Sequence, residues 1–129
     1  MTIELPFPPS VNHYWLVNRN GSRRISDAGL AFRDETILAV RQAGFKAIEG
    51  RVALRISAHP PDERRRDLDN ILKPILDALQ HAGCYADDSQ VDDLHILRGE
   101  KIERGAVVVT IEVADDPGRQ NAPRAANSA

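Results

Sequence analysis

Apolar and polar residues alternate along several stretches of the chain in the pattern that predicts half-buried strands. Such period-two alternation occurs at Thr2–Leu5 and at Arg51–His59. Two further strands are expected at Val91–Leu97 and Ala106–Val113, joined through Arg98–Gly105 as an antiparallel hairpin. These segments would form the sheet of the protein.

Apolar residues recur at helical spacing in two other segments. The first helix is expected to begin after Ser26 or Asp27, either of which can act as an N-cap. The second is expected at about Asn70–Ala82, capped by Asp69 or by the first residue of that range, which places Pro74 in the first turn, where no N–H donor is needed. The predicted order is β-α-β-α-β-β, an α+β fold in one compact domain whose small mixed sheet packs against two helices.

Length and composition narrow the class of protein. The chain has 129 residues, of which 42% are hydrophobic and 28% charged, as in one ordinary globular domain. We assign residues 1–114 to this domain and residues 115–129, which contain no aliphatic side chain larger than Ala, to a disordered tail. Neither a bilayer-spanning apolar run nor a secretion signal is recognisable, so we expect a cytoplasmic protein without a membrane partner.

The net charge of −2 conceals an uneven distribution of charge along the chain. Residues 10–66 carry 11 basic and 6 acidic side chains, whereas residues 67–116 carry 4 basic and 12 acidic ones. A cationic surface attracts phosphate and an anionic cluster attracts divalent cations, so their junction at Arg66 and Asp67 suggests a metal-dependent nuclease. Two solvated faces of opposite charge are the alternative.

Acidic residues at two places in the sequence are candidates for a metal site. If Asp67 and Asp69 lie in extended backbone before the second helix, their side chains project to the same side. The helix would return the chain so that Asp87 and Asp88 come back near this pair. Carboxylates gathered in this way suit Mg²⁺, with Mn²⁺ as a possible substitute. Capping of the helix is the alternative for the first two acids.

Lysine and arginine residues surround these acids in the sequence. Lys73 lies one helical turn after Asp69 and could reach a metal-bound phosphate, while Asp77 could either orient this lysine or form an ordinary ion pair with it. Tyr14 and Trp15 could stack on bases or cover the edge of the core. The candidate DNA-binding side chains besides Lys73 are Arg19, Arg23, Arg24, Arg64, Arg65 and Arg66, for which solvated loops are the alternative.

Three sequence motifs in this order and spacing resemble the RusA family of Holliday junction resolvases. They are Leu5–Asn12 at the start, Arg65–Asn70 with Lys73 in the middle, and the stretch from Asp77 through Gly83 to Asp87–Val91. The resemblance implies that Asp67, Asp69 and Asp88 are the metal-binding acids and that Lys73 and Arg66 are essential basic residues. It also implies a homodimer, dependence on Mg²⁺ and a compact α/β domain.

The function expected on these grounds is phosphodiester hydrolysis in four-way junction DNA, with Asp67, Asp69, Lys73 and Asp88 as catalytic residues. A homodimer would present two such sites, which matches the two-fold symmetry of a four-way junction. Two alternatives stay open. A binding module would recognise branched DNA without cleaving it, and a small-molecule phosphohydrolase would use the metal without preferring junctions.

Overall fold

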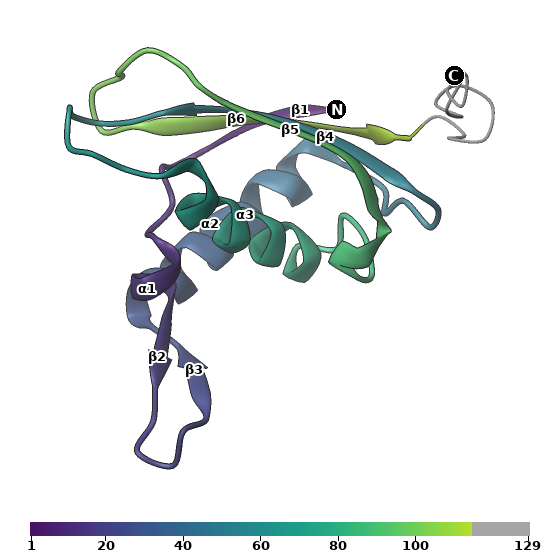
Figure 1. Cartoon of the computed structure of the whole chain (residues 1–129). Helices are drawn as coiled ribbons and strands as arrows, with labels where there is room; N and C mark the ends of the chain where they lie inside the picture. The colour runs from purple at the N-terminus through teal and green to yellow at the C-terminus, as the bar shows by residue number, and fades with distance from the viewer. Residues whose placement is uncertain (115–129) are drawn as a thin grey trace, which may run out of the picture.

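A four-stranded sheet carries both long helices on one of its faces (Figure 1). The computed structural model describes residues 1–114, so the expected tail at 115–129 lies outside the described residues. The sheet strands are β1 (Thr2–Leu5), β4 (Val52–His59), β5 (Val91–Arg98) and β6 (Ala106–Val113), in the spatial order β1-β6-β4-β5. The helices are α2 (Asp27–Ala43) and α3 (Leu68–His81).

The core lies between the sheet and these two helices. Alternate residues of β4 are buried, as the period-two pattern predicts, because only one face of the sheet is covered. Residues from α3 that recur every three or four positions complete the core. The fully or almost fully buried side chains of β4 and α3 include Val52, Leu54, Ile56, Ala58, Ile71, Ile75, Ala78 and Leu79. The α+β architecture and the mixed sheet packed on helices are thus confirmed.

The expected hairpin between the last two strands is wrong. β5 pairs with β4 in parallel and β6 pairs with β4 antiparallel, so β4 lies between them. Helix α3 makes the crossover from β4 to β5, which returns the chain in the direction of β4. The connection over residues 99–105 then carries the chain past the end of β4 to its other side. Alternation identified both strands but contains no information about which strand each one pairs with.

A small hairpin that the sequence pattern does not predict projects away from the sheet (Figure 1). A four-residue helix α1 (Val11–Tyr14) leads into β2 (Trp15–Val17), which pairs antiparallel with β3 (Arg23–Ile25). Each strand has only three residues, too few for an alternating pattern to be recognised. The hairpin places Trp15 and Arg23 in a pocket with Lys73 of α3.

Helix α2 begins after Ser26, one of the two N-cap residues that the sequence offers. The Ser26 hydroxyl accepts a hydrogen bond from the Gly29 N–H at 2.9 Å, which satisfies one donor of the first turn. Gly44 ends the helix in the left-handed conformation, with φ 67°.

Helix α3 begins earlier than expected, at Leu68, with Asp67 as its N-cap. Pro74 therefore lies inside the helix rather than in its first turn, and the missing N–H removes one helical hydrogen bond. Burial of Pro74 in the core offsets part of this loss. No helix within residues 1–114 has both the length and the apolar character needed to cross a membrane.

Candidate active site

The first two candidate acids lie at the start of α3, and only the first of them has the extended backbone that was expected for both. Asp67 is the N-cap residue, with extended backbone angles and no side-chain capping hydrogen bond, whereas Asp69 is in the first turn. Because successive helical residues are about 100° apart, two residues at this spacing do not share a side of the helix. Asp69 instead shares its face with Lys73, one turn further along.

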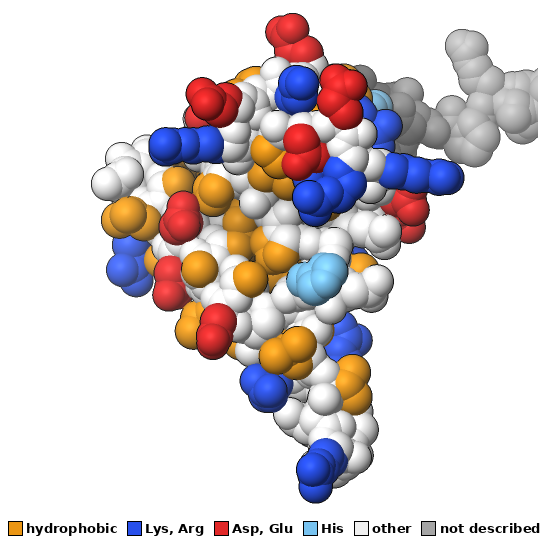
Figure 2. All heavy atoms as spheres, turned by 90° about the vertical axis from the view of Figure 1, so that its left-hand side faces the viewer, with side chains coloured by type: hydrophobic (Ala, Val, Ile, Leu, Met, Phe, Trp, Pro, Cys, Tyr) orange, Lys and Arg blue, Asp and Glu red, His pale blue; other side chains and the backbone are white. Residues whose placement is uncertain are grey.

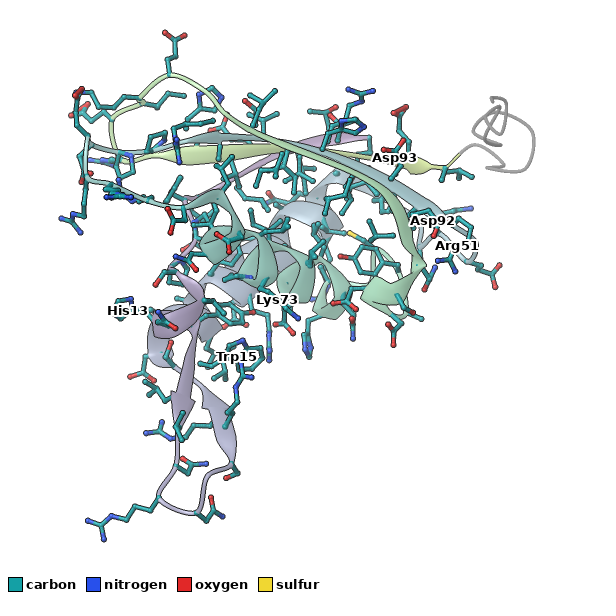
Figure 3. The ribbon with its side chains drawn as sticks, viewed as in Figure 1. His13, Trp15, Arg51, Lys73, Asp92 and Asp93 are labelled. Atoms are coloured by element: carbon teal, nitrogen blue, oxygen red, sulfur yellow. The ribbon has the colours of Figure 1, made fainter. Side chains whose placement is uncertain are left out.

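Lys73 and Asp88 line the same pocket, of about 410 Å³. Asp88 begins a short 3₁₀ helix, η1 (Asp88–Gln90), and its backbone N–H donates to the Gln80 side chain of α3 at 3.0 Å. The long connection after α3 is thereby fixed on the Lys73 side of that helix. The pocket is completed by Val11, Trp15, Arg23 and Asp77. Figure 3 shows Lys73 extending from α3 toward Trp15 of the hairpin.

Asp77 takes part in a network that joins three helices and does not pair with Lys73. Its carboxylate accepts a hydrogen bond from the Tyr14 hydroxyl and forms an ion pair with Arg33 at 2.9 Å, and His81 lies 3.5 Å away. Burial, followed by the hydrogen bond to Asp77, raises the pKa of Tyr14 well above its usual range. Asp77 therefore holds α1 and α2 against α3, and the ion pair with Lys73 that the sequence suggested is not formed.

The acids between residues 62 and 93 fall into two groups according to their partners. Within the described part of the chain, the side chains of Asp67, Asp69 and Asp88 accept no hydrogen bond from a protein donor and form no ion pair, and Lys73 is exposed and equally unpaired. The other aspartates of this range all have partners. These pairs are Asp62 with Arg66, Asp77 with Tyr14 and Arg33, Asp87 with the Ser89 N–H, Asp92 with Arg51, and Asp93 with His95.

Asp87 differs from its neighbour Asp88 because it has a structural role. It caps η1, where its carboxylate accepts a hydrogen bond from the Ser89 N–H at 2.8 Å. The Gln90 side chain completes the capping box by accepting a hydrogen bond from the Asp87 N–H. The backbone hydrogen bond from Ser89 is the main cause that lowers the pKa of Asp87. Another aspartate near η1 also has a structural role, because Asp92 forms an ion pair with Arg51, which lies beside it in Figure 3.

The free carboxylates have the chemistry of a magnesium site, but they do not form a closed cage. Among residues 1–114, no group of three or more His, Cys, Asp or Glu side chains is close enough together to hold a metal ion. Mg²⁺ is commonly held by one or two carboxylates together with water and substrate phosphate oxygens, so such a cage is not required. Carboxylates without protein partners are available for this mode of binding.

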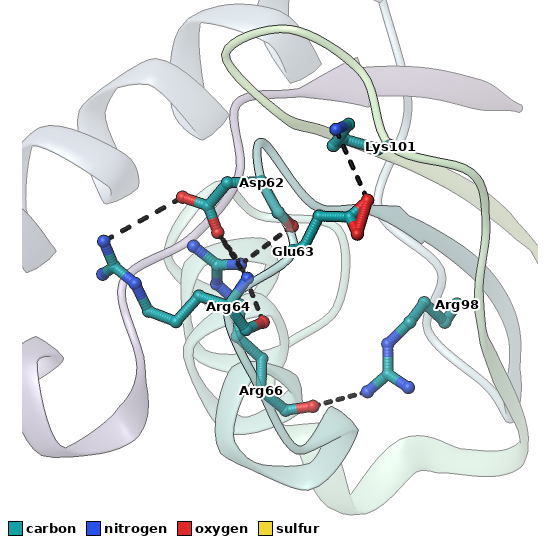
Figure 4. A network of polar contacts seen from close by, with 6 residues as sticks. All are labelled: Asp62, Glu63, Arg64, Arg66, Arg98 and Lys101. Atoms are coloured by element: carbon teal, nitrogen blue, oxygen red, sulfur yellow. Dashed lines mark hydrogen bonds and ion pairs between the residues drawn. The ribbon is translucent and has the colours of Figure 1, made fainter.

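Three arginines precede α3 in a loop that is tied to the β5–β6 connection (Figure 4). Arg66 donates to the Asp62 carboxylate at 2.7 Å and also lies over the Phe7 ring at 5.4 Å from its centroid. The hydrogen bond from Arg66 is the largest cause that lowers the pKa of Asp62 to about 2. Arg64 is much more exposed and lies 4.0 Å from the same acid.

Two basic residues that the sequence analysis did not select come to the same loop. Arg98, at the end of β5, donates to the Arg66 carbonyl, and Lys101 lies 3.5 Å from Glu63. They are more than thirty residues from the arginine run, and no local pattern places them there. Figure 2 shows this end of the molecule, with basic and acidic side chains gathered above an apolar hollow. The hollow is lined in part by Phe7, Arg65 and Asp67.

The three arginine side chains of the hairpin have different contacts. Arg23 lies over the Trp15 ring, 5.1 Å from its centroid, and lines the Lys73 pocket. Arg24 donates to the Asn18 side chain at 2.9 Å, while Arg19 is exposed in the turn. Among the candidate arginines, Arg23 lines the Lys73 pocket, whereas Arg64, Arg65 and Arg66 line a hollow together with Asp67.

Comparisons with known proteins give one consistent result. A sequence model of the family described as Endodeoxyribonuclease RusA matches residues 6–113. The crossover junction endodeoxyribonuclease rusA of Enterobacteria phage HK97 is 44% identical over 109 residues, which cover 83% of this chain and 89% of that protein. The protein of the same name from Escherichia coli strain K12 is 40% identical over 111 residues, covering 85% and 92%. That of Enterobacteria phage 82 is 40% identical over 110 residues, covering 84% and 91%.

Proposed function

Because the chain belongs to the endodeoxyribonuclease RusA family, we propose that it is a metal-dependent nuclease that resolves four-way DNA junctions in the cytoplasm. The relatives are named for action on crossover junctions, and they match the chain over nearly its whole described length. The observation that carries the proposal is the separation of the acids into two groups. Asp67, Asp69 and Asp88 are free while their neighbours are engaged, and Lys73 lies in the pocket of Asp88.

In the proposed mechanism Asp67, Asp69 and Asp88 are the carboxylates that would hold Mg²⁺. The ion, when bound, activates water and polarises the phosphate. Lys73 acts as a point charge that stabilises the negative charge developing on the phosphate in the transition state. In-line attack of water on the phosphorus breaks its bond to the 3′ oxygen. One DNA fragment then ends in a 5′-phosphate and the other in a 3′-hydroxyl. The arginine loop and the hairpin bind the neighbouring phosphates.

We also propose that two copies of the chain act together. β5 is an eight-residue strand at the edge of the sheet, and Leu94 and Leu97 on it are 38% and 57% exposed. An open edge of this length is a surface suited to pairing with another chain. A two-fold dimer would present two pockets of opposite polarity to the two opposed strands of a junction.

A cleavage assay with a labelled four-way junction tests the proposed function. The junction and a linear duplex of the same sequence are incubated with the protein, with and without Mg²⁺. We expect cleavage of the junction alone, and only with Mg²⁺. Asp69→Asn should abolish this cleavage while junction binding in EDTA survives. Binding without cleavage by the wild-type chain would instead indicate a binding module, and hydrolysis without preference for junctions would indicate a general phosphohydrolase.

A further inference from the structure

Trp15 is the aromatic side chain that faces the Lys73 pocket. Its neighbour Tyr14 is fully buried, with its hydroxyl bonded to Asp77, so Tyr14 belongs to the core and cannot stack on DNA. Trp15 is only half-buried and lines the pocket together with Lys73 and Asp88. The two adjacent aromatic residues thus have different roles, one structural and one facing the pocket.

The Trp15 ring is held in place by the ring of Tyr14. Tyr14 meets it edge to face, with ring centroids 4.9 Å apart and planes at 82°. Tyr14 itself is fixed between helices by Asp77, which is in turn paired with Arg33. A ring held in this way loses little conformational freedom when a flat ligand stacks on it.

The Arg23 guanidinium lies over the face of the indole, 5.1 Å from the ring centroid. Trp15 and Arg23 lie diagonally across the hairpin on the same face, because Trp15 pairs with Ile25 and Arg23 pairs with Val17. An exposed cation–π contact is weaker than the stacking of a nucleobase on an aromatic ring. A base can therefore replace the guanidinium, which is then free to contact the phosphate of the same nucleotide.

We propose that Trp15 and Arg23 form a binding site for one nucleotide next to the scissile phosphate, in which the base stacks on the indole and the guanidinium contacts the phosphate. Bases at a branch point lose a stacking neighbour more readily than bases within a duplex, so this site favours a junction over linear DNA. The inference rests on the proposed function, because the scissile phosphate is assigned to the adjoining Lys73 and Asp88 pocket. It adds a specificity-determining role for the hairpin.

The intrinsic fluorescence of the chain tests this proposal directly, because Trp15 is its single tryptophan. The wild-type protein is titrated in EDTA, where cleavage is excluded, with a four-way junction and with a linear duplex of the same sequence. We expect strong quenching of the Trp15 emission at saturation by the junction and little change with the duplex. A junction that binds tightly but leaves the emission unchanged would overturn the proposal, whether or not the protein cleaves DNA.

Variants separate stacking from a structural role. Trp15→Phe keeps a ring and should bind the junction within about threefold of the wild type, whereas Trp15→Leu should lose about tenfold in junction affinity with duplex affinity unchanged. Leu16→Ala, on the opposite face of the hairpin, is the matched control and should leave both affinities unchanged. An equal loss for junction and duplex, or no loss in Trp15→Leu, would contradict the proposal. Wild-type cleavage of the junction is scored separately, so failure of the proposed function remains distinguishable.

Discussion

At the scale of single residues, the side chains around α3 separate into those that hold the fold and those that are free to bind a ligand. Asp87 and Asp88 are adjacent in the sequence, yet one caps η1 and the other faces the Lys73 pocket. The three arginines before α3 divide in the same way, because Arg66 is bonded to Asp62 while Arg65 is exposed. Residue type alone cannot make these distinctions, which depend on the partners that the fold supplies.

Arg65 and Arg66 should therefore respond differently to replacement by alanine. Arg65→Ala should leave the melting temperature unchanged, weaken junction binding and reduce the slope of log affinity against log salt by about 1, the expected effect of losing one phosphate contact. Arg66→Ala should lower the melting temperature, because Asp62 loses its partner and Phe7 loses the overlying guanidinium. Equal melting temperatures in the two variants would show that Arg66 does not anchor the loop.

The Asp62 carboxyl should contribute to the acid sensitivity of the protein. Its pKa is about 2, below the ordinary value of 3.8, so its ion pair stabilises the folded state above about pH 4. This stabilisation is lost as the pH falls from 4 through 2, because the carboxylate becomes protonated. Asp62→Asn should accordingly show a shallower loss of stability over this interval, measured by urea unfolding at a series of pH values. An unchanged pH dependence would mean that the ion pair does not stabilise the fold.

At the scale of elements, the position of the hairpin depends on close contact between α1 and α2. Gly29 lies in the first turn of α2, and a Cβ at this position would come within 2.6 Å of the Tyr14 carbonyl oxygen. The glycine therefore allows the backbone of α1 to lie against α2. The Asp77 network then fixes the same junction through side chains.

Replacement of Gly29 by alanine should force these elements apart. We expect Gly29→Ala to lower the free energy of unfolding by about 2 kcal/mol, as overpacking does, because backbone rather than a flexible side chain must move. Gly50→Ala is the matched control, since no atom lies within 4 Å of a Cβ there, and it should have almost no effect on stability. Chemical denaturation of the two variants measures the difference, and equal stabilities would contradict the role of Gly29.

The elements also show how far the sequence predicts this fold. The strands Thr2–Leu5 and Ala106–Val113 follow from local patterns and were correctly predicted, and the cap of α2 is Ser26, one of the two predicted residues. The position of β4 between the last two strands could not be predicted, because pairing depends on contacts distant in sequence. The candidate acids were selected from their spacing and resemblance, whereas the role of Asp77 depends on Tyr14 and Arg33, which lie far away along the chain.

At the scale of the whole molecule, the hairpin meets α3 at the Lys73 pocket, the arginine loop leads into the start of α3, and β5 forms an open edge of the sheet (Figure 1). If this edge joins two copies, a charge placed on it should separate them. Leu97→Asp should convert a dimer to a monomer in light scattering and reduce paired cleavage of both strands. Leu38→Asp is the control, because Leu38 is 55% exposed on α2, away from the edge. A wild-type chain that is monomeric with and without junction DNA would contradict the dimer.

The proposed nuclease activity depends on the acids that have no protein partner. Single-turnover cleavage of a four-way junction by Asp88→Asn and by Asp87→Asn tests this claim most directly, because the two variants make the same change at adjacent positions. Asparagine caps a helix as well as aspartate does, so η1 should persist in Asp87→Asn. We predict a loss of about 100-fold or more in Asp88→Asn with junction binding retained in EDTA, and nearly wild-type cleavage by Asp87→Asn. Equal rates in the two variants, or the larger loss in Asp87→Asn, would contradict the account.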